Sequence, residues 1–328
     1  MGCPPRRGKR TAPTSIMVRR GPTEDVEIRI RRFDPKKMKP YSVCLFLGKR
    51  NTGKSFLLKD ILYHSRRIYP AGNVISETDH LTHHYDDFIP GMLIHRSYDP
   101  SILDNLFTRQ EKARKEGWQH PGAFLVMDDC FADKKWQSDP MIRKVFLEGR
   151  HFLLFFALAT QEVLGLPPAL RLQTDYVFIL RNNILEERRK LHKHYCGMMD
   201  FETFESVMQS CTENYGCLVV DNLTQSNKLE DQIFYYKAEP HDGIKICHEQ
   251  FWAVNAADYV PRPSSGPSVS SGNGTGGSRK SHSGGNNNNS NQKSNGGATS
   301  HSDSLPAQKN KKKDEYNKGG RRITIVTK

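Results

Sequence analysis

The sequence lacks any apolar run long enough to cross a lipid bilayer. Its longest uninterrupted apolar stretch is residues 152–159, whereas a membrane-spanning helix needs about 20 such residues. The first twenty residues also lack the apolar core of a secretory signal peptide and are rich in Arg, Pro and Thr instead. We therefore expect neither a transmembrane segment nor a signal peptide.

Closely paired cysteines are absent as well. The chain has seven cysteines, but no two form a C-x-x-C pair, and Cys44 lies within an expected buried strand. This usage is typical of a reducing compartment. His192, His194 and Cys196 lie close together, but their spacing fits none of the standard zinc patterns, so we expect no zinc site there.

Excess positive charge is absent from the middle of the chain, although the formal net charge of the whole is +13. Residues 1–40 contain 12 Lys and Arg against 4 Asp and Glu, and residues 262–328 contain 12 against 3. Residues 41–261 therefore carry a net charge of −4. Basic ends of this kind bind polyanions such as double-stranded DNA without reading its sequence. The alternative is that they only keep the protein solvated.

The sequence does contain a phosphate-binding loop. Residues 43–47 are a short apolar run typical of a buried strand, residues 48–55 read GKRNTGKS, and a helical pattern follows. This matches G-x-x-x-x-G-K-[ST] in the strand-and-helix setting that the motif requires. The expected nucleotide-binding residues are Gly48, Lys49, Arg50, Asn51, Thr52, Gly53, Lys54 and Ser55.

Each fixed position of the loop has a physical role. Gly48 and Gly53 allow a tight backbone path whose N–H groups surround a phosphate, and the positive end of the following helix adds to the attraction. Lys54 supplies a cation for the β- and γ-phosphates, and Ser55 offers a hydroxyl to Mg²⁺. ATP and Mg²⁺ are the expected ligands, although the loop does not read the base and leaves GTP open.

Strands and helices alternate through the middle of the chain. Apolar patterns predict strands at residues 26–30, 43–47, 74–76, 124–127, 152–159 and 176–180. Helices are predicted after the phosphate loop, after the Asp-Pro pairs at 99–100 and 139–140, and around residues 184–194 and 200–209. Residues 216–221 and 232–238 predict a hairpin at the edge of the sheet. This alternation predicts an α/β fold with a largely parallel central sheet flanked by helices.

Composition predicts the domain boundaries. Residues 1–23 are interpreted as a basic disordered arm, residues 24–260 as a P-loop ATPase domain, and residues 261–328 as a disordered tail rich in Ser, Gly and Asn with a basic C-terminal cluster. Such a tail cannot bury enough apolar surface to offset its chain entropy. Residues 323–326 form an apolar strip within it, either a docking peptide or a frayed end.

Polar groups follow the predicted strands at their carboxyl ends, where ligands gather in open α/β sheets. Asp128 is the expected Mg²⁺ partner, held directly or through water. Asp129 is expected to orient or deprotonate the attacking water, or else only to cap the next loop. Gln161 is expected to hydrogen-bond the water and the γ-phosphate, or to be an ordinary polar residue at a strand end.

Phosphoryl transfer also gains from positive charge on the transferring group. We favour Arg150, acting on the nucleotide of a neighbouring subunit, as the catalytic arginine. Arg50, Arg171 and Arg181 are the other candidates, and any of these arginines could instead hold a structural ion pair.

With these residues identified, residues 41–221 resemble the genome-packaging ATPases of the nucleocytoplasmic large DNA viruses, members of the FtsK–HerA superfamily of P-loop motors. The resemblance depends on GKRNTGKS at 48–55, MDDC at 127–130 and GRH to ATQ at 149–161; residues 76–90 also resemble the algal-virus branch. It implies an additional-strand, RecA-like fold in which the strand carrying Gln161 lies between the phosphate-loop strand and the Asp-Asp strand. Many relatives have Glu where this chain has Asp129.

The resemblance also implies roles and partners. Lys54, Asp129, Gln161 and Arg150 would be catalytic, and Ser55 and Asp128 would hold Mg²⁺. The protein would be an ATP-hydrolysing motor that forms a homo-oligomeric ring and moves double-stranded viral DNA into a capsid, with capsid or portal components as partners. It would act in the viral factory of the host cytoplasm and in the virion. The alternatives are another DNA-dependent P-loop ATPase, of helicase or DNA-segregation type, and a nucleotide-binding DNA tether without motor activity.

Overall fold

The computed structural model of the protein describes residues 15–19, 27–130, 134–258 and 325–327. All of them belong to one compact unit formed by Met1–Arg262 and Arg321–Lys328, whereas a second unit, Pro263–Gly320, lies wholly outside them. The predicted domain boundaries, and the predicted disorder of most of both ends, therefore stay predictions.

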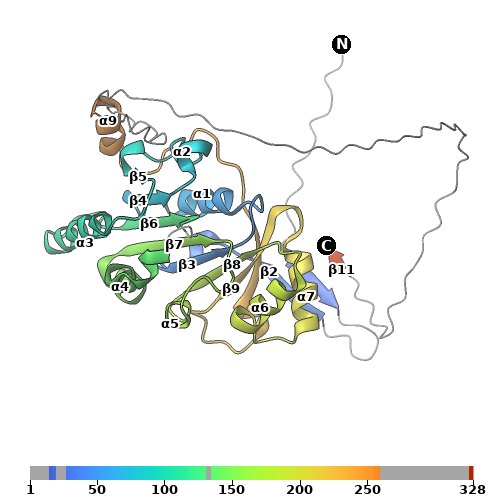
Figure 1. Ribbon diagram of the computed structural model, residues 1–328. Helices are drawn as coiled ribbons and strands as arrows, with labels where there is room; N and C mark the ends of the chain where they lie inside the picture. Colours follow the sequence, from blue (N-terminus) through green and yellow to red (C-terminus); the bar gives the residue numbers. More distant parts are fainter. Residues whose placement is uncertain (1–14, 20–26, 131–133, 259–324, 328) are drawn as a thin grey trace, which may run out of the picture. The chain divides into compact units, whose positions relative to one another are not determined.

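An eleven-stranded mixed sheet runs through the described residues in the order β11-β1-β2-β10-β9-β8-β3-β7-β6-β4-β5 (Figure 1). The strands are β1 (Ser15–Arg19), β2 (Glu27–Arg32), β3 (Val43–Leu47), β4 (Ala71–Ser76), β5 (Ile94–His95), β6 (Ala123–Asp128), β7 (Leu154–Thr160), β8 (Tyr176–Leu180), β9 (Gly216–Asp221), β10 (Ile233–Lys237) and β11 (Ile325–Thr327). The six strands from β8 to β5 are all parallel to their neighbours. The predicted α/β fold with a largely parallel sheet is confirmed.

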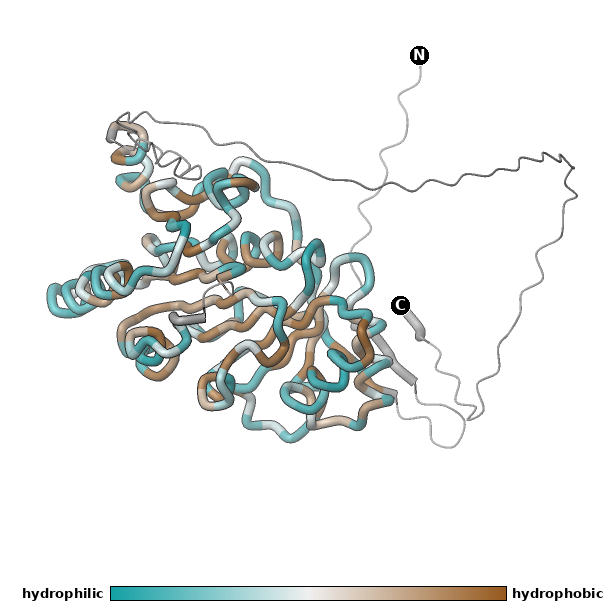
Figure 2. The backbone as a smooth tube through the Cα atoms, in the orientation of Figure 1, coloured by the Kyte–Doolittle hydropathy of each residue, from teal (hydrophilic) through white to brown (hydrophobic). Residues whose placement is uncertain are grey.

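Helices cover both faces of the sheet (Figure 1), and its central strands consist mostly of hydrophobic residues (Figure 2). The α-helices of the described residues are α1 (Lys54–Ser65), α2 (Asp79–Thr82), α3 (Pro100–Lys115), α4 (Pro140–Glu148), α5 (Pro168–Arg171), α6 (Leu185–Tyr195), α7 (Phe201–Cys211), α8 (Leu229–Gln232) and α9 (Glu249–Asp258). Successive side chains of a strand point to opposite faces. Leu45 and Leu47 accordingly join the core under α3, α4 and α7, whereas Cys44 and Phe46 join the core under α1.

Helices α3 and α4 begin at the Asp-Pro pairs that predicted them. Asp99 Oδ1 accepts the N–H of Ser101 at 2.8 Å, and Asp139 Oδ1 accepts the N–H of Met141 at 2.7 Å. These carboxylates pair two of the N–H groups that have no partner inside a helix. The proline occupies the first turn in both helices, where its missing N–H is not needed.

The structure differs from two predictions at the end of the sheet where β1, β2 and β11 lie. Strands β9 and β10 are antiparallel, as a hairpin requires, but β10 also pairs with β2, so the two strands lie inside the sheet. Ser15–Arg19 lies in the predicted disordered arm yet forms β1, with Ile16 opposite Ile30 of β2. The apolar alternation of β2 thus continues in its neighbour. Ile325–Thr327 adds β11 to β1, so the prediction of disorder is wrong for these two segments.

Two element boundaries also differ from the prediction. The apolar run that begins at Phe152 does not enter the sheet until Leu154, because Gly149–Phe152 forms a 3-10 turn and Leu153 has a φ of 56°. Apolarity reports burial rather than conformation, and a turn packed on the core satisfies the same pattern. The polar stretch after β4 contains the short helix α2, and helix α9 had no counterpart in the sequence analysis.

Candidate nucleotide-binding site

Four parallel strands end side by side at the phosphate loop. Strand β3, which leads into the loop, lies between β8 and β7, and β7 pairs in turn with β6. The strand that carries Gln161 therefore lies between the phosphate-loop strand and the strand that ends in Asp128, as the family resemblance implied. Because parallel strands end at one edge, their terminal polar groups share one region.

The phosphate loop follows a path that its glycines make possible. A Cβ at position 48 would lie 2.6 Å from Thr52 Oγ1 and 2.9 Å from Leu180 Cβ, closer than nonbonded atoms approach. Gly53 has a φ of 96° immediately before α1, in the left-handed region that glycine tolerates best. The N–H of Gly48 also donates to the carbonyl of Thr160 at 3.1 Å, which ties the start of the loop to β7.

The Lys54 ammonium folds back over the loop. Its Nζ donates to the carbonyl oxygens of Gly48 at 2.9 Å and Lys49 at 3.1 Å. Burial lowers the pKa of Lys54 from its ordinary value, and the charges of Asp128 and Asp129 oppose that shift. An incoming phosphate would offer this cation charged oxygen partners in place of two neutral carbonyls.

Asp128 accepts two hydrogen bonds on one carboxylate oxygen. Ser55 Oγ lies 2.8 Å and Tyr85 Oη 2.7 Å from Asp128 Oδ2. Burial raises the pKa of Asp128, and the donations from Tyr85 and Ser55 oppose the rise. A hydroxyl and a carboxylate in contact are hard oxygen ligands of the kind that Mg²⁺ prefers beside a phosphate. The residues present therefore fit this ion, and Ser55 and Asp128 would be its protein ligands.

Asp129 and Gln161 meet at the neighbouring strand ends. Gln161 Nε2 donates to Asp129 Oδ1 at 2.8 Å. Asp129 has a φ of 58°, a left-handed conformation that is uncommon for residues other than glycine and that clusters at functional sites. This backbone conformation gives the side chain of Asp129 a different set of partners from that of Asp128, which accepts hydrogen bonds from Ser55 and Tyr85. The two adjacent carboxylates are thus engaged by different partners.

A cavity of about 730 Å³ opens beside these groups. Its wall includes Lys49 and Arg50 of the loop, Gln161 and Glu162 after β7, and Asn182 after β8. Of the strand ends that the sequence predicted to converge, those of β3, β7 and β8 contribute residues to the wall of this cavity. Asp128 and Asp129, which follow β6, are not part of that wall. Lys49, Arg50 and Lys190 bring positive charge to this cavity, whereas Glu162 and Glu187 bring negative charge; Val163, Leu164 and Ile184 add apolar surface.

Three of the four candidate arginines divide between the amino ends and the carboxyl ends of the parallel strands. Arg150 Nη2 lies 3.4 Å from Asp175 Oδ1 at the amino ends of the strands, where Asp175 Oδ2 also accepts the N–H of Val43. Arg150 therefore does not reach the nucleotide site of its own chain. Arg50 lies in the loop, and Arg181, which donates to Asn183 Oδ1 at 3.1 Å, follows β8 at the carboxyl edge. Action of Arg150 across a subunit interface stays a prediction.

Two tyrosines at the site were not singled out from the sequence. Tyr85 lies within the stretch 76–90 that carried part of the family resemblance, but no local pattern pointed its hydroxyl at Asp128. Tyr215 is 72% exposed, has a φ of 63°, and its Cδ1 lies 3.5 Å from where a Cβ would stand on Gly53. Neither contact could be predicted from the sequence, because the two residues of each pair lie far apart along the chain.

The fold and this site place the chain among the α/β folds of the P-loop NTPases, in the additional-strand form in which β7 lies between β3 and β6. No family model matches the sequence. The chain is 36% identical over 219 residues to the uncharacterized protein L437 of Acanthamoeba polyphaga mimivirus, covering 64% of this chain and 77% of that one. It is 32% identical over 237 residues to the uncharacterized protein 075L of Invertebrate iridescent virus 6, covering 68% and 92%.

The chain therefore belongs to the family that includes L437 and 075L, proteins of nucleocytoplasmic large DNA viruses. Among solved structures it is similar to the genome packaging NTPase B204 of Sulfolobus turreted icosahedral virus 2 in complex with AMPPCP, with a TM-score of 0.46 and 18% identity, covering 62% of this chain and all of that one. It is also similar to the pCW3 conjugation coupling protein TcpA, with a TM-score of 0.40 and 10% identity, covering 69% and 66%.

Across the described residues, no helix combines the length and the apolar character that a membrane span requires.

Proposed function

We propose that this protein hydrolyses ATP as a subunit of a homo-oligomeric motor that moves double-stranded viral DNA into a capsid. The observation that carries the catalytic part is the pair of contacts at adjacent strand ends, Ser55 with Asp128 and Gln161 with Asp129, beside a complete phosphate loop. The motif resemblance supports the packaging role, and the relatives L437 and 075L are proteins of large DNA viruses.

The chemistry follows from these positions. In hydrolysis the oxygen of a water molecule bonds to the γ-phosphorus, the bond to the bridging oxygen of the diphosphate breaks, and a proton leaves the water. Asp129 is the carboxylate that accepts this proton, and Gln161 orients both Asp129 and the water. Ser55 and Asp128 would hold Mg²⁺, which would supply positive charge against the phosphate oxygens of the bound nucleotide.

Lys54 supports the proposal because its present partners are weak ones. It exchanges the carbonyls of Gly48 and Lys49 for phosphate oxygens when ATP binds. Gln161 has a comparable choice between Asp129 and the γ-phosphate. The state of the nucleotide is thereby linked to the end of β7, the central strand of the site.

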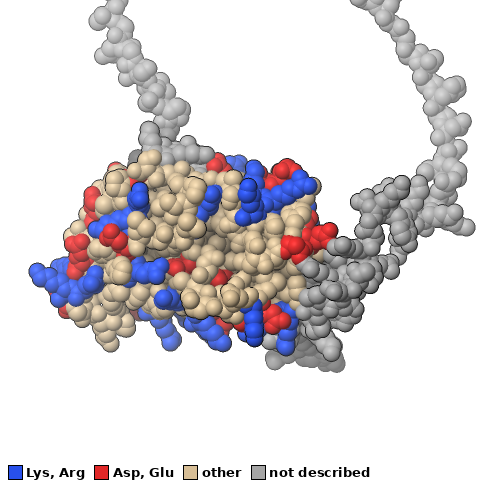
Figure 3. All heavy atoms as spheres, turned by 90° about the horizontal axis from the view of Figure 1, so that it is seen from below, with Lys and Arg blue, Asp and Glu red and all other residues tan. Residues whose placement is uncertain are grey.

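DNA binding is assigned to the ends of the chain. Figure 3 shows Lys and Arg mixed with Asp and Glu over the face in view, without a wide area of positive charge. The sequence instead concentrates its basic residues in 1–40 and 262–328. Such segments hold DNA phosphates by counterion release, so DNA binding should weaken steeply as salt rises. The viral factory of the host cytoplasm and the virion are the proposed sites of action, with capsid or portal components as partners.

The test is ATP turnover of the full chain with and without duplex DNA. Wild-type protein should hydrolyse ATP, and it should do so faster on DNA. Lys54→Ala should lower turnover by roughly 100-fold or more, because it removes the ammonium group that would stabilise the transferring phosphoryl group. The matched control is Lys59→Ala, since Lys59 lies on the same helix but faces the Phe88 ring at 4.9 Å.

The outcomes separate the possible functions. Equal turnover in wild type and Lys54→Ala would remove the site assignment. Turnover that is indifferent to duplex DNA would contradict the motor. Strand separation by the protein would favour a helicase, and DNA binding without turnover would favour a tether.

A further inference from the structure

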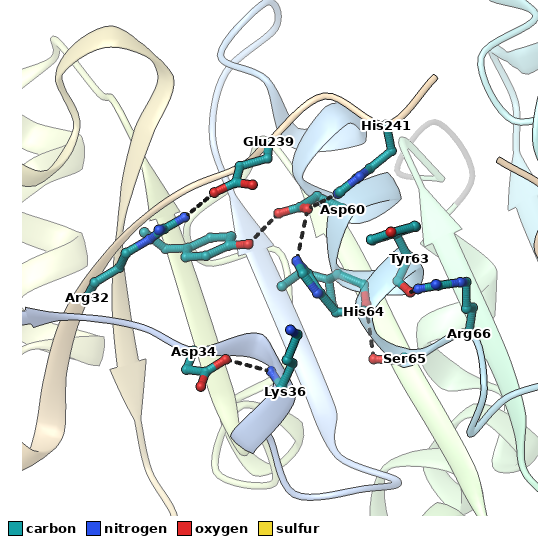
Figure 4. Close-up of polar contacts among 12 residues, drawn as sticks. Arg32, Asp34, Lys36, Asp60, Tyr63, His64, Ser65, Arg66, Glu239 and His241 are labelled. Atoms are coloured by element: carbon teal, nitrogen blue, oxygen red, sulfur yellow. Dashed lines mark hydrogen bonds and ion pairs between the residues drawn. The ribbon is translucent and has the colours of Figure 1, made fainter. Parts of the chain in front are cut away.

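A second group of polar side chains lies on α1, away from the phosphate loop (Figure 4). Asp60 and His64 come from the later turns of this helix, and His241 comes from the segment that follows β10. One ligand atom of each side chain lies within 4.8 Å of those of the other two. We propose that Asp60, His64 and His241 form a binding site for a divalent transition-metal ion, of which Zn²⁺ is the natural occupant.

The two imidazoles converge on one carboxylate oxygen. His241 Nε2 lies 2.6 Å and His64 Nε2 3.4 Å from Asp60 Oδ1. Ligand atoms around a tetrahedral Zn²⁺ with bonds of about 2 Å lie roughly 3.3 Å apart. Small side-chain movements therefore bring all three atoms onto one ion, and a fourth position remains for water.

The surroundings orient the proposed ligands. Tyr236 Oη donates to Asp60 Oδ2 at 2.5 Å, which leaves Oδ1 to face the imidazoles. The ring of Tyr63 stacks on His241 with centroids 3.6 Å apart and an interplanar angle of 21°. Metal ligands are commonly held by hydrogen bonds and packing of this kind, which set the direction of the donor atoms.

Burial gives the site a reason to hold a cation. The Asp60 side chain is fully buried, whereas those of His64 and His241 are 17% and 13% exposed. A buried carboxylate needs a positive partner, and the exposed edges of the imidazoles leave a path for an ion to enter. Nearby, Arg32 is paired with Glu239 at 2.6 Å, and Lys36 is exposed, so neither of these two cations pairs directly with Asp60.

The ligand set selects the class of metal. Imidazole nitrogen suits Zn²⁺ and its neighbours in the transition series, whereas Mg²⁺ and Ca²⁺ prefer an all-oxygen shell. This site would thus differ in kind from the Ser55 and Asp128 pair. Its physical effect would be to tie the segment after β10 to the helix whose first turn carries Lys54 and Ser55.

The experiment uses the full chain, stripped with a chelator and kept reduced, and titrates it with Co²⁺ and then Zn²⁺. We expect one Co²⁺ per chain with visible absorption bands of low-symmetry coordination, displacement of those bands by Zn²⁺, and a rise in melting temperature of roughly 5 °C or more at 100-fold excess over Kd. His241→Ala should weaken binding roughly 100-fold, and Tyr236→Phe roughly 10-fold.

Two controls distinguish this site from others on the chain. His120→Ala removes an exposed histidine outside the cluster and should leave binding unchanged. Asp128→Asn removes the magnesium ligand and should also leave it unchanged, so the result does not depend on the proposed ATPase. Absence of Co²⁺ binding in the wild type, or equal binding by wild type and His241→Ala, would overturn the proposal.

Discussion

At the scale of single residues, Tyr85 is the least expected member of the nucleotide site. It is 2% exposed, and its hydroxyl shares Asp128 Oδ2 with the hydroxyl of Ser55. Its backbone N–H is held in turn by Asp79 Oδ1 at 2.8 Å. Tyr85 therefore fixes the direction of the Asp128 carboxylate, the proposed ligand of Mg²⁺.

Replacing Tyr85 with Phe should raise the Mg²⁺ concentration for half-maximal ATP turnover by roughly 10-fold, because a hydrogen bond that orients the ligand is lost. The titration of turnover against Mg²⁺ measures this. Tyr235→Phe is the matched control, since its buried hydroxyl has no hydrogen-bond partner among the described residues. An unchanged Mg²⁺ requirement in Tyr85→Phe would show that Ser55 alone positions Asp128.

At the scale of elements, the helix starts are set by local chemistry. The cap at Asp139 begins α4, and the 3-10 turn that follows α4 leads the chain back into β7. A change at this cap therefore acts on the path into the strand that carries Gln161. It should alter stability without touching the site directly.

Asp139→Ala should lower the free energy of unfolding by about 1 kcal/mol, because the N–H of Met141 loses its acceptor. Asp139→Asn should retain most of the stability, since Asn caps helices as well as Asp does. Chemical denaturation of the two variants measures the difference. Equal loss in both would show that the charge of Asp139, rather than its hydrogen bond, is what stabilises α4.

At the scale of the whole molecule, the position of Arg150 bears on the proposed homo-oligomer. Arg150 lies at the edge of the sheet away from its own phosphate loop and is 45% exposed on its side chain. A partly exposed ion pair such as Arg150 with Asp175 contributes at most about 1 kcal/mol. The arginine is therefore not committed to a structural role.

Mixing Arg150→Ala chains with Lys54→Ala chains should restore part of the ATP turnover that each has lost. In a ring, some interfaces would combine an intact Lys54 with an intact Arg150 from the neighbour. Turnover of the mixture, with assembly checked by native mass measurement, tests this. Assembly without restored turnover would direct attention to Arg50 and Arg181, the candidates on the carboxyl edge.

The sequence by itself determined the features that depend on near neighbours along the chain. The phosphate loop, the Asp-Pro helix starts and the polar groups at strand ends all follow from residues within one or two turns of each other. That the strand carrying Gln161 lies between the phosphate-loop strand and the strand ending in Asp128 came from the family resemblance, and the structure confirmed it. Residues 48–55 could therefore be identified as a phosphate loop before any fold was known.

Only the tertiary structure decided which distant side chains meet. His241 and Asp60 are 181 positions apart, and Tyr85 and Asp128 are 43 apart, so no periodicity could have paired them. His192, which the sequence places beside His194 and Cys196 without a standard zinc spacing, has its Nε2 2.6 Å from the carbonyl oxygen of Met199. Long-range contacts depend on how the strands are ordered in the sheet and how the helices pack on it. The position of Arg150 at the amino ends of the strands, away from the phosphate loop, has the same cause.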